Sequence, residues 1–277
     1  MACDEIVPRP GTMDAVIVAE MQRDPYGVRG RVKTGDVVID AGANIGAFAR
    51  FVLQTAPSAR VFCIEPMPSN VDALRKNLNE LPNCNILGAA LMGKPGSVIL
   101  HDYGAASSAC HSVLKLGVKA EGTVEVPGVT LPEIMKKYGL NRVDFLKLDV
   151  QGAEFEIIAC CPSSLLARVE YIAMEAHAGI ANAETVLGEV PDYRRQLAGL
   201  IRKLAKTHLC VRGYPTRRSA VLGWTLRESV SWACVWRHRL RLWVVGPFVR
   251  FKAFLLVLAA RILPGPVKAA IRRLIKR

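Results

Sequence analysis

Short apolar runs alternate with helical segments along residues 36 to 175, and this alternation restricts the possible folds more than any other feature of the chain. Continuous apolar strands that are separated by helices indicate a parallel sheet buried on both faces. The sequence therefore predicts an α/β fold, with a mostly parallel sheet between two layers of helices. The strands are expected at 36–41, 60–65, 85–91, 97–103, 143–150 and 169–176.

The segments between and after these strands complete the predicted architecture. Residues 104–122 are rich in Gly, Ala and Ser and are expected to form a long loop. The composition changes after His238, so we divide the chain there. This division predicts a lead-in (1–34), a main domain (35–238) and a helical tail (239–277). The further elements expected are helices at 44–54, 69–81, after Thr130, from Ala153 and at 192–206, and a closing pair of strands at 208–215 and 231–238.

Acidic side chains stand where several of the predicted strands end. Asp40, Glu65 and Asp149 each close an apolar run, and Glu175 lies near the end of another. In open parallel sheets, ligands bind beyond the carboxyl ends of the strands. We therefore expect these four acids to surround a ligand site.

The turn after the first strand, "DAGANIG" at 40–46, indicates which ligand the site prefers. A dinucleotide fingerprint has glycine at its first position, and this chain has Asp40 there. A carboxylate would repel a pyrophosphate but attract a cation. S-adenosylmethionine (SAM) carries a sulfonium and an ammonium group, so SAM fits this turn better than NAD. An NAD(P)-dependent oxidoreductase is the alternative, because an acid such as Glu65 at the end of the second strand accepts ribose hydroxyls of either cofactor.

Three motifs together resemble a known family. They are "IDAGANIG", "EPMPSN" after the second strand and "KLDVQGAE" at 147–154. In this combination, over roughly residues 35 to 180, the chain resembles the FkbM-type SAM-dependent methyltransferases. The resemblance implies a Rossmann-like class I methyltransferase fold with a seven-stranded sheet. It also implies O-methylation of a hydroxyl on a carbohydrate, glycolipid or polyketide-like acceptor.

The resemblance also implies roles for individual residues. Asp40, Gly42, Asn44 and Gly46 would line the methionine end of SAM, and Glu65 would hold the ribose. The adenine would pack on Met67, with Ala89 at its edge.

Three residues are candidates for removing the hydroxyl proton: Asp149, Glu175 and His177. Asp149 would face the reacting methyl group, and a period of two places Glu175 and His177 on one side of their strand. His111 in the 104–122 loop is a weaker candidate, and Glu154 is expected only to favour a helix dipole. Asp149 and Glu175 could instead hold a divalent metal such as Mg²⁺, although no spacing in the sequence requires one.

The tail accounts for most of the net charge of +13. Residues 229–277 contain eleven Lys or Arg and no Asp or Glu, so the preceding chain carries only +2. Residues 267–277 alternate apolar and basic positions in the pattern of an amphipathic helix, which favours an anionic membrane surface. Packing on the body or at a dimer interface is the alternative, and nucleic acid is not an expected partner. A non-catalytic membrane-associated protein that retains the fold also stays open.

The cysteines indicate the compartment. The eight cysteines form no C-x-x-C pair, and several lie in apolar runs, which is typical of small buried thiols in a reducing environment. The first twenty residues contain no apolar stretch of the kind found in secretory signals. We expect a cytoplasmic protein, with the inner face of a membrane as a candidate place of attachment.

Overall fold

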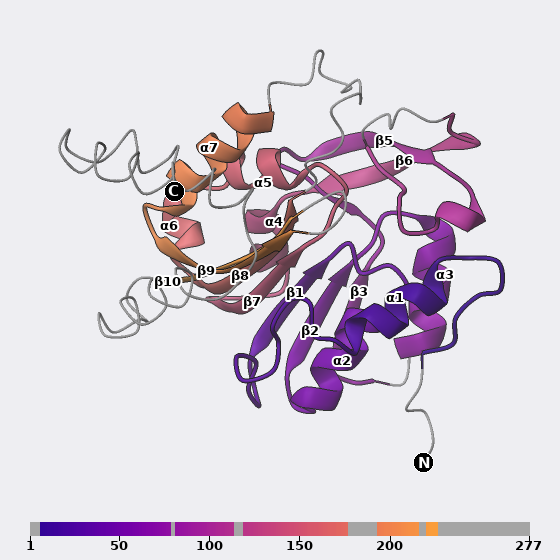
Figure 1. Ribbon diagram of the computed structural model, residues 1–277, viewed down its shortest axis with the longest axis horizontal. Helices are drawn as coiled ribbons and strands as arrows, with labels where there is room; N and C mark the ends of the chain where they lie inside the picture. The colour runs from indigo at the N-terminus through magenta and orange to yellow at the C-terminus, as the bar shows by residue number, and fades with distance from the viewer. Residues whose placement is uncertain (1–5, 79–80, 114–118, 177–192, 216–219, 227–277) are drawn as a thin grey trace, which may run out of the picture. The chain divides into compact units, whose positions relative to one another are not determined.

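The computed structural model describes residues 6–78, 81–113, 119–176, 193–215 and 220–226 (Figure 1). Within these ranges, the main sheet has seven strands in the order β3-β2-β1-β7-β8-β10-β9. Their bounds are β1 Val37–Ala41, β2 Arg60–Ile64, β3 Cys84–Leu87, β7 Val143–Leu148, β8 Val169–Ala176, β9 His208–Pro215 and β10 Ala220–Leu226.

The pairing of these strands confirms the predicted mostly parallel sheet. The strands β3, β2, β1, β7 and β8 are joined by parallel ladders, whereas β10 runs antiparallel to both β8 and β9. From β1 the chain moves outward through β2 to β3 and then returns to place β7 on the other side of β1. Such a reversal of strand order opens a crevice at the carboxyl ends of the two central strands. Here those central strands are β1 and β7.

Helices cover both faces of the sheet, as the sequence predicts (Figure 1). Successive residues of a buried strand point to opposite faces. Accordingly, Val38 belongs to a buried cluster that includes residues of α1, α2 and α3, while its neighbour Ile39 belongs to one that includes residues of α4, α5, α6 and α7. The helices are α1 Asp14–Met21, α2 Ala47–Thr55, α3 Pro68–Leu78, α4 Leu131–Lys137, α5 Glu154–Cys160, α6 Ser163–Leu166 and α7 Tyr193–Leu204.

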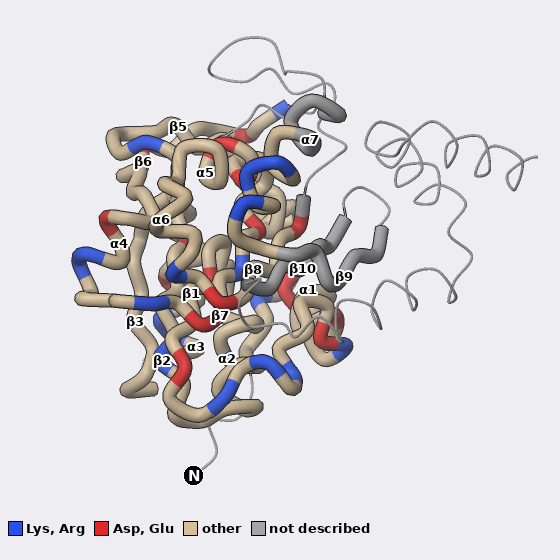
Figure 2. Tube along the Cα trace, turned by 90° about the vertical axis from the view of Figure 1, so that its left-hand side faces the viewer, with Lys and Arg blue, Asp and Glu red and all other residues tan. Residues whose placement is uncertain are grey.

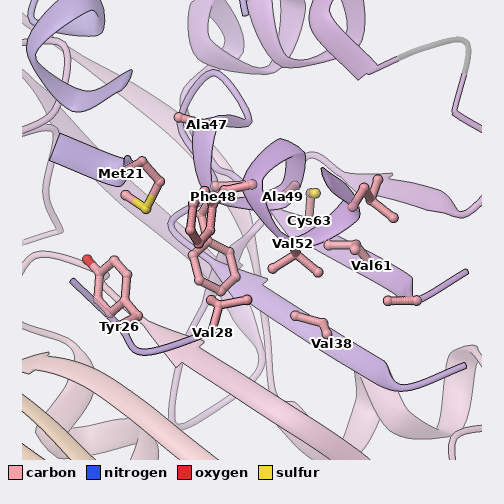
Figure 3. Close-up of a cluster of buried hydrophobic side chains, with 14 of the residues drawn as sticks. Met21, Tyr26, Val28, Val38, Ala47, Phe48, Ala49, Val52, Val61 and Cys63 are labelled. Carbon is pink, nitrogen blue, oxygen red and sulfur yellow. The ribbon is translucent and has the colours of Figure 1, made fainter. Parts of the chain in front are cut away.

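The core on the α2 side also includes the lead-in. Figure 3 shows Met21, Tyr26 and Val28 beside Phe48 and Val52 of α2. Val28 is fully buried, and the ring of Tyr26 meets that of Phe48 edge to face at 5.6 Å between centroids. The segment before β1 is therefore part of the core of the sheet domain.

A second sheet departs from the predicted arrangement. The run at 85–91, expected as one strand, divides into β3 and β4 (Ala90–Leu91). The run at 97–103 forms β5 (Gly96–Asp102), which pairs with β6 (Gly122–Val129) outside the main sheet. In the order β4-β6-β5, β6 runs antiparallel to β5 and parallel to β4, and an antiparallel pair needs no helical crossover.

The closing pair of strands is partly as predicted. β9 occupies the expected residues, but its antiparallel partner is β10 at 220–226 rather than the run at 231–238. The nearer segment reaches the neighbouring position after a short connection, which antiparallel pairing allows. The run at 231–238, the predicted boundary near His238, the tail at 239–277 and the candidate His177 lie outside the described residues.

Charge is mixed over the described elements. Figure 2 shows basic and acidic positions interspersed along the chain trace, in keeping with the small net charge of the sequence before the tail. Among the described helices, none is long and apolar enough to cross a membrane.

Candidate active site

The glycine turn after β1 is shaped by three residues with positive φ. These are Gly42 at 77°, Asn44 at 49° and Gly46 at 93°, and Gly46 precedes the first turn of α2. A Cβ on Gly42 would lie 1.8 Å from the backbone oxygen of Asp149. Glycine is therefore needed at position 42 for the turn to pass close to the end of β7. The turn presents the first amides of α2, which lack acceptors within the helix and can bind a carboxylate.

Asp40 is paired with a lysine from the neighbouring strand. It is fully buried, and the Nζ of Lys147 donates to its Oδ1 at 3.0 Å and to the carbonyl of Gly42 at 2.9 Å. Burial raises the pKa of Asp40 despite the opposing charge of Lys147. Burial would lower the pKa of Lys147, but the charges of Asp40 and Asp149 outweigh it and raise that pKa. The position of Asp40 in the sequence suggested an unpaired acid that faces the ligand. In the structure, Asp40 is instead paired with Lys147.

One carboxylate oxygen of Asp40 can still interact with a ligand. Its Oδ2 is buried without a hydrogen-bond partner among the described residues. A buried acceptor of this kind is costly to leave unsatisfied.

The signal for Lys147 was visible in the sequence as a lysine inside the apolar run "FLKLD", but only the register Asp40↔Lys147 shows what it pairs with.

Glu65 follows β2 and is held by three donors. The amides of Asn44 and Met67 lie at 2.8 and 3.0 Å from its two oxygens, and the Nδ2 of Asn70 lies at 3.3 Å. Burial raises the pKa of Glu65, against these hydrogen bonds, which favour the charged form. Because a carboxylate offers about four acceptor positions, Glu65 can accept from a ribose hydroxyl as well.

The residues predicted to meet the adenine lie near Glu65. Met67 is 3% exposed and packs with Ala90 and Leu100 of the second sheet. The amide of Ala89 donates to the carbonyl of Glu65 at 3.1 Å. The residues predicted to bind the ribose and the adenine thus lie close together, just after β2 and β3.

Asp149, just after β7, is joined to Glu175 of β8 through a tyrosine. The hydroxyl of Tyr26 lies 2.9 Å from Asp149 Oδ2 and 3.5 Å from Glu175 Oε2. Gln151 Nε2 donates to Asp149 Oδ1 at 3.3 Å, and Lys147 Nζ lies 3.8 Å from Asp149 Oδ2. No sequence pattern singled out Tyr26, because it stands in an aperiodic segment far from both acids in the chain.

Glu154 has a more specific role than the predicted interaction with a helix dipole. It is fully buried, and its oxygens accept from the amides of Val150 at 3.0 Å and Gly152 at 2.9 Å. Gln151 between them has a φ of 55°, a conformation that costs energy for a residue other than glycine. Glu154 therefore fastens the turn that carries Asp149.

The loop at 104–112 contacts both the glycine turn after β1 and the turn after β7. The carbonyl of Ser108 accepts from Asn44 Nδ2 at 2.9 Å, and Ser112 Oγ donates to the carbonyl of Gln151 at 2.8 Å. His111 in this loop lies 3.2 Å from Asp102 through its Nδ1. Burial lowers the pKa of His111 against the charge of Asp102. His111 thus pairs with Asp102, and no contact joins it to Asp149 among those that the structure gives.

The residues present fit SAM. The α2 amides suit its carboxylate, the buried oxygen of Asp40 suits a cationic group, and Glu65 suits the ribose diol. Over the ranges that the structure describes, no group of three or more His, Cys, Asp or Glu side chains is placed to hold a metal ion. A mostly parallel sheet with a glycine turn after β1, an acid after β2 and a buried carboxylate at the turn has the features of a SAM-dependent methyltransferase of class I architecture.

The chain belongs to the FkbM methyltransferase family. The family model, described as the methyltransferase FkbM domain, matches residues 40–200. The predicted family, the methyltransferase activity and the SAM cofactor are thereby confirmed, and the oxidoreductase alternative is wrong.

Individual relatives are distant. The 2-O-methyltransferase NoeI of Sinorhizobium fredii is 26% identical over 58% of this chain and 73% of its own length. The hexuronic acid methyltransferase AglP of Haloferax volcanii is 27% identical over 52% and 57%. The 31-O-demethyl-FK506 methyltransferase FkbM of Streptomyces tacrolimicus is 25% identical over 57% and 70%. Among solved structures, SAM-bound fibrillarin of Aeropyrum pernix has a TM-score of 0.44 at 15% identity, over 74% of each chain.

Replacing Glu65 with glutamine is expected to raise the Kd for SAM about 10- to 100-fold, because hydrogen bonds to a charged group are worth about 1.5–3 kcal/mol. Isothermal titration of SAM into the folded variant measures the change. Glu20→Gln, on the exposed side of α1, is the matched control and should leave Kd unchanged. An unaltered Kd in Glu65→Gln would show that Glu65 does not bind the ribose.

Proposed function

We propose that this chain transfers the methyl group of SAM to a hydroxyl oxygen of a carbohydrate, glycolipid or polyketide-like small molecule. The observation that supports this most is the pair of carboxylates, Asp149 and Glu175, that Tyr26 joins at the carboxyl ends of β7 and β8. The names of two relatives, a 2-O-methyltransferase and a 31-O-demethyl-FK506 methyltransferase, also point to oxygen as the methyl acceptor.

In this proposal, Asp149 receives the acceptor hydroxyl and takes its proton. When bound, SAM supplies the methyl group; the new O–CH₃ bond forms as the S–CH₃ bond breaks, and the hydroxyl proton passes to the Asp149 carboxylate. A positioned base of this kind typically contributes about 10²–10⁴-fold. Holding the oxygen in line with the methyl carbon contributes further through orientation.

The charges around the site favour a cationic methyl donor. The Nζ of Lys147 lies 3.0 Å from Asp40 and 3.8 Å from Asp149, the charge of Glu175 also acts on this lysine, and its side chain is 3% exposed. The negative charge of these carboxylates attracts a sulfonium in a setting where water screens little. Methyl transfer removes that positive charge, so the same carboxylates should hold S-adenosylhomocysteine less strongly than SAM.

A methyl-transfer assay with labelled SAM and a panel of acceptors tests the proposal. The panel contains neutral oligosaccharides, uronic acids, glycolipids and macrolide polyols, with primary amines as the comparison class. We expect label in an alkali-stable O-methyl ether. Label only on amines, or only in alkali-labile methyl esters, would contradict hydroxyl methylation.

We further propose that the protein is cytoplasmic and that its basic tail attaches it to anionic membranes. The excess of eleven positive charges over residues 229–277 supports this, at about 1 kcal/mol for each basic residue near the surface. The full chain should float with phosphatidylserine vesicles but not with phosphatidylcholine vesicles. The variant Arg272→Gln/Arg273→Gln/Lys276→Gln should float less, and equal flotation of both proteins would contradict the attachment.

A further inference from the structure

Tyr26 lies outside the stretch that the family model matches, yet it is held firmly against the site. The turn that carries Tyr26 is closed by Asp24, whose carboxylate accepts from the amides of Val28 at 2.6 Å and Arg29 at 3.0 Å. Tyr26 itself is 4% exposed, and its ring packs edge to face on Phe48 (Figure 3). The backbone and ring are therefore fixed independently of what the hydroxyl contacts.

The hydroxyl of Tyr26 lies between two carboxylates. It donates to Asp149 Oδ2 at 2.9 Å, while Glu175 Oε2 lies at 3.5 Å. A phenol has one proton to donate, so the shorter contact with Asp149 takes it. Burial, together with the negative charges of Asp149 and Glu175, raises the pKa of Tyr26 well above its ordinary value. The phenol therefore stays protonated and acts as a donor, not as a base.

Other groups set the charge around this contact. Lys147 on β7 lies 3.8 Å from Asp149 Oδ2, and its Nζ lies 5.4 Å from the centre of the Tyr26 ring. Asp40 on β1 is paired with the same lysine, and Gln151 binds the other oxygen of Asp149. Lys147 is thus shared between two acids, and Tyr26 contributes a neutral donor between Asp149 and Glu175.

We propose that Tyr26 is a positioning residue for methyl transfer, whose hydroxyl orients the Asp149 carboxylate beside Glu175. This inference rests on the proposed function, in which Asp149 takes the proton of the acceptor. A hydrogen bond to the charged form of a carboxyl group favours ionisation, and a neighbouring like charge opposes it. Removing the hydroxyl takes away one hydrogen bond to that charged form and leaves the like charge in place.

The test uses the full chain with Tyr26→Phe, which retains the ring and its packing on Phe48. Carboxyl ¹³C NMR, with the signals assigned through Asp149→Asn and Glu175→Gln, follows the titration of the pair without SAM or acceptor. We expect the apparent pKa of the pair to rise by about one unit. The acidic limb of the kcat profile should move upward by about the same amount, while Kd for SAM changes by less than about twofold.

Tyr138→Phe is the matched control, because Tyr138 stacks on Phe62 at the end of α4 and makes no contact with either acid in the structure. It should leave both the titration and the pH profile unchanged. An unshifted titration in Tyr26→Phe would overturn the inference, as would a loss of SAM affinity that equals the loss of kcat. If the titration shifts but the wild-type protein methylates no hydroxyl, the proposed function is wrong and the coupling of Tyr26 to the carboxylates stands.

Discussion

Replacing Lys147 with methionine is expected to lower the free energy of unfolding by about 3–5 kcal/mol, because it leaves the buried carboxylate of Asp40 without its partner. Lys147 is 3% exposed and Asp40 is fully buried, so water cannot replace the lost ion pair. Urea unfolding, followed by both fluorescence and circular dichroism, measures the change. Lys136→Met, at an exposed position of α4, should change stability by less than about 0.5 kcal/mol.

A second variant separates the ion pair from simple packing. In Asp40→Asn/Lys147→Met, no buried charge is left unpaired between these two positions, so much of the lost stability should return. In Lys147→Met alone, burial holds the pKa of Asp40 above its unfolded value, so the folded state binds a proton that the unfolded state releases. The loss should therefore be largest at high pH and shrink as pH falls through the folded pKa of Asp40. Equal losses in the single and double variants would contradict this account.

Replacing Asp149 with asparagine is expected to lower kcat by about 10²–10⁴-fold, because the variant cannot take the proton of the acceptor hydroxyl. Asparagine can still accept from Tyr26, so the local fold should persist. Single-turnover transfer to an acceptor found in the panel measures the chemical step directly. Asp72→Asn is the matched control, since the Asp72 side chain is 70% exposed on α3.

Two further measurements decide between the roles open to Asp149. Activity of the wild-type protein that survives EDTA, with Asp149→Asn inactive, supports proton transfer or positioning rather than metal binding. If Asp149→Asn keeps most of its activity while Glu175→Gln loses it, Glu175 is the base and the proposed assignment is wrong. The pH profile of Tyr26→Phe should then follow Glu175 instead.

Much of the site could be predicted from local sequence. The glycine turn is one example, since positions 42 and 46 adopt positive φ that glycine reaches without strain. The acids at strand ends are another, because every parallel strand delivers its carboxyl end to the same edge. Asp40, Glu65 and Asp149 each follow an apolar run that is long enough to identify as a strand.

The second sheet and the closing strand show where local pattern fails. The run at 97–103 has the composition of a buried strand, yet β5 pairs with β6 in a separate sheet. The run at 231–238 was predicted to pair with β9, but the segment that pairs with it is 220–226, which also has strand-like composition. Strand propensity reports that a segment is extended and partly buried, but it does not choose the partner.

The amino-acid sequence by itself determined the α/β class, the SAM turn and the strand-end acids, because these depend on short-range periodicity and on the conformations that glycine allows. Only the tertiary structure decided how the charges of these acids are balanced. Lys147 meets Asp40 through the register of β1 and β7, and Tyr26 meets Asp149 from a segment 123 residues away. Such contacts depend on which strands are neighbours and on how the lead-in packs against α2, and no local pattern contains that information.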